Sequence, residues 1–227
     1  MLSLGGLGGG TSVQPSLTAS HGIPTLALAY FGAPGLPTQL KDIPLEYFEK
    51  ALQWLSTQPG VDPNRIAVVG ISRGGELALL LAADFPSLVH RAVACTTDAH
   101  VLGAFPPPAT GAAWTLGGKP VPFGLLPVDQ ITVPTLITGG GKDEVIDSRP
   151  ATKQLLDIAH SHGRSNVTGR IYPNAGHGVG CRQPNVPAPA EFEVAPNTFL
   201  SLGGTSASNS EAAVSTWPNL LRFVNAP

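Results

Sequence analysis

Short apolar runs alternate along this chain with segments of helical periodicity, and no other feature limits the possible folds as much. Residues 65–69 and 91–95 are apolar runs of strand length, and the helical pattern of residues 73–85 lies between them and stops before Pro86. The same alternation recurs over most of the chain. Because parallel strands require crossover helices, the sequence predicts an α/β fold with a mostly parallel sheet and helices on both faces.

The other elements follow from the same periodicity. Asp42 is the candidate cap of a helix that begins at Pro44. Two Pro- and Gly-rich segments, residues 97–130 and 178–204, follow strand ends, where open α/β sheets bind ligands. No linker or internal repeat is visible, so residues 1–227 are assigned to a single domain. The remaining predicted strands are residues 1–4, 25–31, 134–138 and 168–172, and the remaining helices are residues 44–58, 149–162 and 208–224.

Charge and composition argue against several classes of function. The net charge is −2 and no basic run is present, so no nucleic-acid partner is expected. No apolar stretch approaches the roughly 20 residues that cross a bilayer, so no membrane partner is expected. No two His or Cys residues show ligand spacing on one element, and the Gly-rich run at residues 5–10 lacks the Gly-Lys-Ser/Thr of a phosphate loop. We therefore expect no metal and no cofactor.

The cysteines and the first residues bear on the cellular compartment. Two cysteines in 227 residues are too few for a disulfide scaffold. The N-terminal residues lack the basic and apolar regions of a signal peptide. The expected location is therefore cytoplasmic, with free thiols at Cys95 and Cys181. A Cys95–Cys181 disulfide is the competing interpretation.

The sequence Gly70-Ile-Ser-Arg-Gly74 lies between a predicted strand and a predicted helix. A G-x-S-x-G motif in this context forms a sharp turn that exposes the serine hydroxyl above the sheet, and its glycines let the strand and the helix approach closely. Ser72 is therefore the predicted nucleophile, and an ordinary turn serine is the alternative.

A serine hydroxyl needs a base to become a nucleophile, and the base needs a carboxylate to orient it. His177 lies between glycines just after the last predicted strand, a placement that the other histidines lack. The acid should come between the serine and the histidine in chain order. Asp143 follows the strand at residues 134–138 and is the predicted acid. Glu144 is the alternative, and Asp147 is expected to be a solvated loop charge.

The oxyanion that forms during acyl transfer needs preorganised N–H donors. One is expected from Arg73, the residue after the nucleophile. The other is expected from Leu7 or Gly6, in the Gly-rich run after the first strand.

Four side chains have less specific predicted roles. Trp114 and Phe123 lie in the long segment of residues 97–130. They are expected either to line an acyl pocket or to pack that segment against the rest of the domain. Glu76 is expected to bind backbone or a neighbouring loop. The side chain of Arg73 is expected either to reach a ligand phosphate or to lie in solvent.

Several stretches together resemble one known family. Residues 43–50, Ile-Pro-Leu-Glu-Tyr-Phe-Glu-Lys, and residues 70–77, Gly-Ile-Ser-Arg-Gly-Gly-Glu-Leu, are similar to the C-terminal catalytic domain of acyl-CoA thioesterases and bile-acid-CoA:amino-acid N-acyltransferases. Residues 127–129, residues 172–177 and the glycine pair at 203–204 fit the same family. The resemblance covers nearly the whole chain. It implies an α/β-hydrolase fold, a Ser72–Asp143–His177 triad and hydrolysis of an acyl thioester or ester.

The chain departs from that family in two respects. The N-acyltransferase branch uses a cysteine nucleophile, whereas position 72 is serine, which favours hydrolysis over transfer to an amine. Family members also carry an N-terminal β-sandwich domain and the first two strands of the sheet, and this sequence shows neither. The strand from Thr25 to Phe31 is therefore expected at the sheet edge. Because an apolar edge invites pairing, we expect a second copy in a homo-oligomer, or an irregular segment, to cover it.

The residues predict a serine hydrolase that works through an acyl-enzyme intermediate, and the resemblance implies that its small-molecule substrate is an acyl-CoA thioester. The alternative is a carboxylesterase, similar to dienelactone hydrolases, that acts on small carboxyl esters. A third possibility is a binding protein that keeps the fold without turnover.

Overall fold

The computed structural model describes residues 1–7, 14–184, 188–195 and 197–226. At its centre lies a six-stranded sheet in which every neighbouring pair of strands is parallel, as the alternation of strand and helix predicted. In spatial order the strands are β11 (Val167–Tyr172), β10 (Thr135–Gly140), β5 (Arg91–Cys95), β4 (Ala67–Ile71), β1 (Leu2–Leu4) and β2 (Leu26–Ala27).

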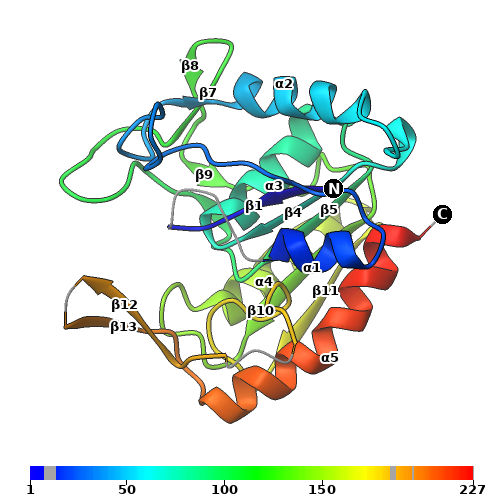
Figure 1. Cartoon of the computed structure of the whole chain (residues 1–227). Helices are drawn as coiled ribbons and strands as arrows, with labels where there is room; N and C mark the ends of the chain where they lie inside the picture. The colour runs from blue at the N-terminus through cyan, green and yellow to red at the C-terminus, as the bar shows by residue number, and fades with distance from the viewer. Residues whose placement is uncertain (8–13, 185–187, 196, 227) are drawn as a thin grey trace.

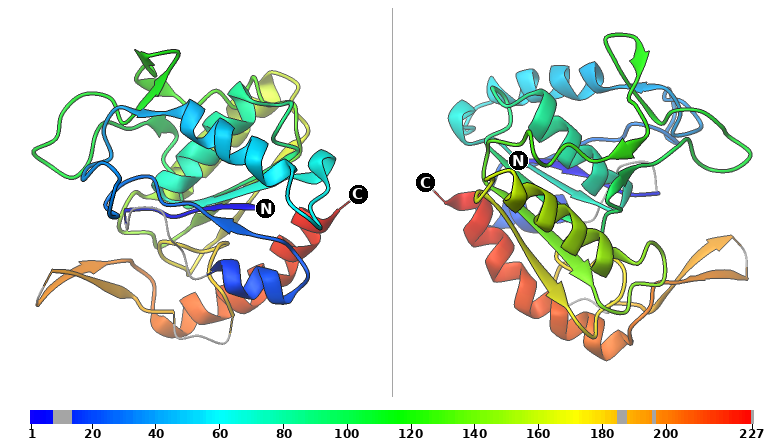
Figure 2. Two further views of the ribbon diagram at one scale, coloured as in Figure 1. Left: turned by 45° about the horizontal axis from the view of Figure 1, so that its top comes forward. Right: turned by 180° about the vertical axis from the view of Figure 1, so that it is seen from behind.

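Helices cover both faces of this sheet (Figures 1 and 2). One face carries α2 (Leu45–Ser56), α3 (Arg73–Asp84) and α4 (Ser148–Ser161), and the other carries α1 (Gln14–Ser20) and α5 (Ser206–Asn225). A short 3-10 helix, Pro63–Arg65, precedes β4. None of the helices in the described residues combines the length and the hydropathy needed to span a bilayer.

The two faces of the sheet belong to two separate apolar layers. Val68 of β4 packs in the layer that holds Leu77 of α3 and Leu155 of α4. Its neighbour Val69 packs in the opposite layer, with Trp217 of α5. Because alternate side chains of β4 are buried on opposite faces, the strand is apolar throughout rather than alternating. The short continuous run at residues 65–69 therefore predicted the strand, although β4 begins and ends two residues later.

The start of α2 differs from the prediction. Ile43 and Pro44 form a short strand, β3 (Ile43–Pro44), that pairs with β7 (Trp114–Leu116), so the helix begins only at Leu45. Pro44 is the cap residue, and no side chain caps this helix. The predicted cap by Asp42 is therefore wrong, because that residue has a left-handed backbone, with φ of 52°, and its N–H bonds the carbonyl of Ala112.

The edge strand is shorter than predicted. Only Leu26 and Ala27 pair with β1, whereas the sequence predicted a strand through Phe31. The chain leaves the sheet because the ring of Tyr30 packs against those of Phe48 and Trp114, and its hydroxyl donates to the carbonyl of Gly5 at 2.6 Å. β2 does lie at the edge, as predicted, with half-buried side chains. The cover predicted for this edge stays a prediction.

The two Pro- and Gly-rich segments contain structure that the periodicity did not reveal. Residues 97–130 hold four short strands, and residues 178–204 hold a hairpin that projects away from the sheet and its helices (Figure 2). The four short strands are β6 (His100–Val101), β7, β8 (Lys119–Pro120) and β9 (Gly124–Leu125). The hairpin consists of β12 (Glu191–Ala195) and β13 (Thr198–Ser201).

Candidate active site

Ser72 occupies the sharp turn between β4 and α3. Its backbone lies at φ of 57° and ψ of −121°, a conformation that costs a non-glycine residue roughly 1–3 kcal/mol. The N–H of Ser72 donates to the carbonyl of Cys95 at 2.8 Å, which holds the turn against β5. A Cβ at Gly70 would overlap the carbonyl of Gly74, and one at Gly74 would overlap that of Gly5. These glycines therefore allow the close approach that the strained turn requires.

The loops after β10 and β11 bring Asp143 and His177 together. Nδ1 of His177 lies 3.1 Å from Oδ1 and 3.0 Å from Oδ2 of Asp143. The other two carboxylates that the sequence singled out lie elsewhere, since Glu144 is exposed and accepts a hydrogen bond from the hydroxyl of Ser201, and Asp147 is exposed. Of the three, Asp143 is the one placed to orient His177.

Asp143 is held as a carboxylate by its surroundings. It accepts hydrogen bonds from the hydroxyl of Ser148 at 2.6 Å and from the backbone N–H of Val145 at 2.9 Å. Burial alone would raise the pKa of Asp143, but the hydrogen bond and charge of His177, with these two donors, bring the pKa below its ordinary value of 3.8. An ionised Asp143 fixes the tautomer of His177 with the proton on Nδ1, which leaves Nε2 as the free base.

The loop that carries His177 packs directly on the strands around Ser72. The N–H of Gly178 donates to the hydroxyl of Thr96 at 3.0 Å, and a Cβ at Gly178 would lie 3.1 Å from Cδ1 of Ile71, the residue before Ser72. The N–H of His177 itself donates to the carbonyl of Leu202 at 2.6 Å. The predicted base and nucleophile thus lie on adjoining segments at the carboxyl ends of the strands.

A disulfide fastens the same two segments covalently. Cys95, at the end of β5, is bonded to Cys181, four residues beyond His177. The prediction of free thiols is therefore wrong, and the competing interpretation is confirmed. Sequence spacing could not reveal the bond, because the two cysteines are 86 residues apart and only the fold brings them together. Since disulfides persist in oxidising compartments, the thiols no longer support a cytoplasmic location, which stays a prediction.

The predicted oxyanion donors surround Ser72. The backbone of Gly6 is so close that a Cβ there would lie 3.0 Å from Cβ and 3.5 Å from Oγ of Ser72. Arg73 is the first residue of α3, so its N–H has no carbonyl partner within the helix. Leu7 lines the same cavity as Ser72. The rest of the Gly-rich run, residues 8–10, lies outside the described residues.

A cavity of about 350 Å³ opens beside Ser72. Its volume is at the small end of the range for ligand sites, roughly 300–1,000 Å³. Its polar lining comes from Ser72, Arg73, Glu76, Thr97 and Asp98. Its apolar lining comes from Leu7, Leu102, Ala104, Phe105, Val145 and Ile146.

Arg73 and Glu76 form a buried ion pair in this wall, with Nη1 and Oε2 3.1 Å apart. As predicted, Glu76 binds a neighbouring loop, because Oε1 accepts from the N–H of Leu102 and from the indole N–H of Trp114. Burial raises the pKa of Glu76 to about 7, although Arg73 and these two donors oppose the rise. The sequence predicted that the side chain of Arg73 either reaches a ligand phosphate or lies in solvent. That prediction is wrong, since the side chain is buried and donates to the carbonyls of Leu102 and Gly103 as well as pairing with Glu76.

Trp114 and Phe123 lie outside the wall of this cavity as far as the described residues form it. Trp114 is fully buried and fixes its segment to α3 through Glu76, the second of the two roles predicted for it. Phe123 is 63% exposed, with its ring beside Gly103.

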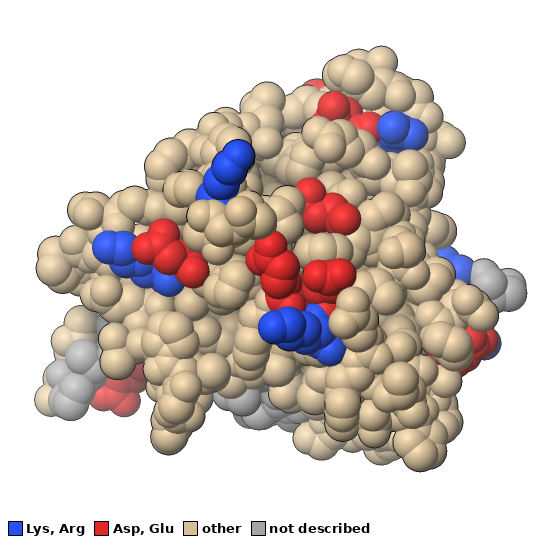
Figure 3. Space-filling view, turned by 90° about the horizontal axis from the view of Figure 1, so that it is seen from above, with Lys and Arg blue, Asp and Glu red and all other residues tan. Residues whose placement is uncertain are grey.

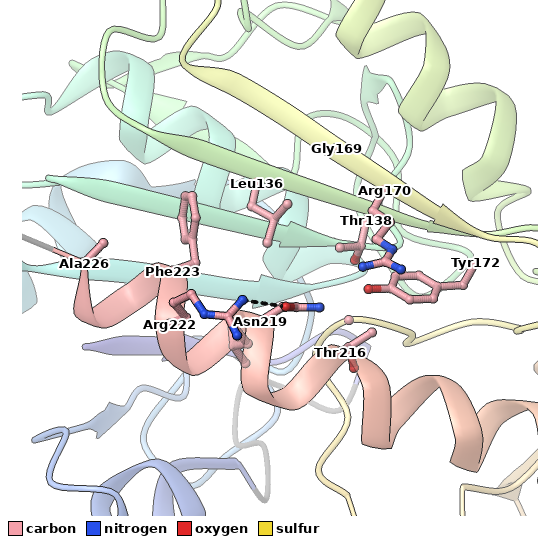
Figure 4. Close-up of a pocket in the computed structure, with 12 residues that line it drawn as sticks. Leu136, Thr138, Gly169, Arg170, Tyr172, Thr216, Asn219, Arg222, Phe223 and Ala226 are labelled. Carbon is pink, nitrogen blue, oxygen red and sulfur yellow. Dashed lines mark hydrogen bonds between the residues drawn. The ribbon is translucent and has the colours of Figure 1, made fainter.

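A second cavity, of about 430 Å³, lies on the other face of the sheet between α5 and the strands β10 and β11 (Figure 4). Arg170 and Tyr172 enter it from β11, and Asn219 and Arg222 from α5. None of the predicted catalytic residues lines it.

On the face seen in Figure 3, the described Lys and Arg side chains are scattered among acidic ones on a mostly uncharged surface. Within the described residues, no group of three His, Cys, Asp or Glu side chains could hold a metal ion.

The curated proteins that are similar to this chain include enzymes named for acyl-CoA substrates. It is 29% identical to acyl-coenzyme A amino acid N-acyltransferase 1 of Mus musculus over 96% of this chain and 57% of that protein. It is 28% identical to acyl-coenzyme A thioesterase 6 of Homo sapiens, over 92% of this chain and 55% of that protein. With bile acid-CoA:amino acid N-acyltransferase of Homo sapiens the identity is 27%, over 97% and 57% of the two chains. The chain thus spans little more than half the length of these relatives.

Solved structures show the fold. The esterase Pf2001 of Pyrococcus furiosus aligns with a TM-score of 0.57 at 14% identity, over 78% of this chain and 74% of that one. MGS-M1, an α/β hydrolase from a Medee basin deep-sea metagenome library, aligns with a TM-score of 0.53 at 17% identity, over 80% and 71%. The predicted α/β-hydrolase fold is confirmed. The family model described as BAAT / Acyl-CoA thioester hydrolase C terminal matches residues 43–104 and 114–226, and the chain therefore belongs to that family.

Proposed function

We propose that this protein is a serine hydrolase that cleaves acyl-CoA thioesters, with Ser72 as nucleophile, His177 as general base and Asp143 as the orienting acid. One observation carries the proposal: a serine in a strained strand-to-helix turn adjoins a loop whose histidine binds a buried carboxylate through Nδ1. This is the arrangement in which a carboxylate sets the imidazole tautomer and the opposite nitrogen takes the serine proton. The thioesterase names among the relatives support the substrate class.

The proposed reaction assigns a residue to each step. Nε2 of His177 takes the hydroxyl proton as Oγ of Ser72 attacks the thioester carbonyl. The backbone N–H groups of Arg73 and of Gly6 or Leu7 stabilise the negative charge that develops on the carbonyl oxygen. Collapse of the intermediate expels coenzyme A, which leaves as the thiol after taking the proton from His177. Water, activated by the same base, then attacks the acyl-serine and releases the carboxylic acid.

Transfer of the acyl group to an amine is the second candidate, because several relatives are named N-acyltransferases. The serine nucleophile favours hydrolysis over transfer, because water readily hydrolyses an acyl-serine ester before an amine can accept the acyl group. Cleavage of small carboxyl esters would use the same three residues and is separated from thioester cleavage by substrate alone.

The test is a rate comparison on purified protein. Thiol release from acyl-CoA is measured beside nitrophenol release from nitrophenyl esters of matched chain length, with and without glycine or taurine. The proposal predicts higher kcat/KM on the thioesters, the free acid as product in the presence of either amine, and a loss of at least about 10⁴-fold in Ser72→Ala. An N-acyl amino acid as main product, or equal rates in Ser72→Ala and wild type, contradicts it.

A further inference from the structure

Three buried polar atoms in the wall beside Ser72 lack a hydrogen-bond partner among the described residues. One is Oε2 of Glu76, which faces Nη1 of Arg73 in their ion pair. The other two, the hydroxyl oxygen of Thr97 and Nε of Arg73, have no ion pair to account for them. Thr97 is 1% exposed and Arg73 5% exposed, and both line the 350 Å³ cavity. Because nearly all buried polar groups in proteins are paired, two such atoms in the wall of one cavity need an explanation.

The fold itself does not explain why the hydroxyl of Thr97 and Nε of Arg73 lack partners. Arg73 uses its terminal nitrogens for Glu76 and for the carbonyls of Leu102 and Gly103, and Nε is the guanidinium nitrogen left without a partner. The Cβ of Thr97 packs against the first turn of α3, 3.2 Å from where a Cβ of Gly75 would lie. An unsubstituted hydrocarbon chain in the cavity would displace water and leave both groups unsatisfied, which is costly.

The charges around these atoms limit what could satisfy them. Arg73 is already paired with the carboxyl group of Glu76, and Asp98 adds a second carboxyl group to the same wall. A further anion is therefore disfavoured here. Nε of Arg73 can only donate and the hydroxyl of Thr97 can donate as well, so a neutral oxygen that accepts hydrogen bonds is the best complement.

We propose, resting on the function proposed above, that Thr97 and Arg73 select acyl groups bearing a hydroxyl or keto oxygen on the third carbon of the acyl chain, counted from the thioester carbonyl. The cavity's small volume favours short or medium acyl chains. A site built to hydrogen-bond a substrate oxygen rejects the analogue without it, because the site's own polar groups then stay unpaired. Thr97 and Arg73 are thus specificity-determining residues.

The experiment compares butanoyl-CoA with its 3-hydroxy and 3-oxo derivatives. Wild type is expected to show a kcat/KM at least about tenfold higher on one of the oxygenated thioesters, the effect of about one good hydrogen bond. Thr97→Val keeps the shape of the side chain but removes the hydroxyl. It should lower kcat/KM on the oxygenated substrate about tenfold and raise it on butanoyl-CoA, whereas Thr97→Ser should retain the preference.

Thr152→Val is the matched control. Thr152, on α4, is also buried with an unpartnered hydroxyl, but it does not line this cavity. The ratio of the two kcat/KM values should therefore be the same in Thr152→Val and wild type. Equal kcat/KM on all three thioesters, or a preference that survives in Thr97→Val, overturns the inference.

Binding to Ser72→Ala separates this inference from the proposed function. Calorimetry on that variant gives the Kd of each intact thioester without turnover. Absent hydrolysis by wild type together with at least tenfold tighter binding of an oxygenated thioester would refute the hydrolase function and support the selectivity. Equal Kd values for all three thioesters would refute the selectivity whether or not wild type hydrolyses them.

Discussion

Replacing Cys95 and Cys181 together by alanine removes the covalent link between β5 and the loop that carries His177. The bond closes a loop of 86 residues, for which the chain-entropy model gives about 4.6 kcal/mol of stabilisation at 25 °C. Removal of a native disulfide costs about 2–5 kcal/mol in practice. For a domain of this size each kcal/mol corresponds to a Tm shift of about 2–4 °C, so a fall of roughly 4–20 °C is expected.

The assay is thermal unfolding followed by far-ultraviolet circular dichroism, in the presence and absence of reductant. Wild type should lose roughly that much in Tm on reduction, and Cys95→Ala/Cys181→Ala should match reduced wild type and not respond to reductant. His177 also keeps its hydrogen bond to Leu202, and Gly178 its bond to Thr96, so reduction should slow catalysis less than loss of His177. Equal Tm values for oxidised and reduced wild type, or alkylation of both cysteines in the native unreduced protein, would refute the reasoning.

Four further outcomes are expected. Asp143→Asn should lower kcat by about 10⁴-fold in the thiol-release assay, because the imidazole of His177 loses the partner that sets its tautomer, and a fall below tenfold would contradict that role. Gly70→Ala should destabilise the fold by about 3 kcal/mol in urea unfolding, because its Cβ would overlap the Gly74 carbonyl, whereas Gly75→Ala should cost less. Burial raises the pKa of Glu76 from 4.5 to about 7, so its contribution to stability is full below about pH 4.5 and is lost as the pH rises through about 7. The unfolding free energy of wild type minus that of Glu76→Gln should therefore fall between these pH values. A difference that does not change with pH would contradict the raised pKa. If a second copy covers β2, sedimentation should show a dimer that Ala27→Pro converts to monomer, since the N–H groups of Leu26 and Leu28 point to β1 and that of Ala27 points outward; a wild-type monomer at every concentration would sink the idea.

Most of the sheet and the helices α2, α3, α4 and α5 could be predicted because their signals are local, whereas α1 was not predicted. β5 was predicted to the residue, and α3 to within one residue, because a buried strand reads as a short apolar run and the helix is stopped before Pro86. The motif around Ser72 could also be identified from the sequence, because a Cβ at Gly70 or Gly74 would overlap neighbouring backbone and both positions therefore require glycine.

The features that were missed depend on contacts between distant segments. Asp42 failed as a cap because β3 pairs with β7, about 70 residues further along the chain. The expected strand through Phe31 ends early because the ring of Tyr30 packs against Phe48 of α2 and Trp114 of β7. The short strands of residues 97–130 pair across Pro- and Gly-rich turns, which leave no periodic pattern.

The candidate site divides in the same way. Ser72, Asp143 and His177 follow strand ends in an order that the fold explains, so the sequence could nominate them. The disulfide, the ion pair of Arg73 with Glu76 and the unpartnered hydroxyl of Thr97 have no sequence signature, because each arises from burial and from neighbours that only the folded chain supplies.

Covalent labelling by a fluorophosphonate tests most directly whether Ser72 is activated by His177. After digestion, mass spectrometry should find the phosphonyl group on the peptide that contains Ser72. The label should be absent in Ser72→Ala and should form at least about 10³-fold more slowly in His177→Ala. A wild-type protein that is folded but takes no label, or takes it on another residue, would contradict the account.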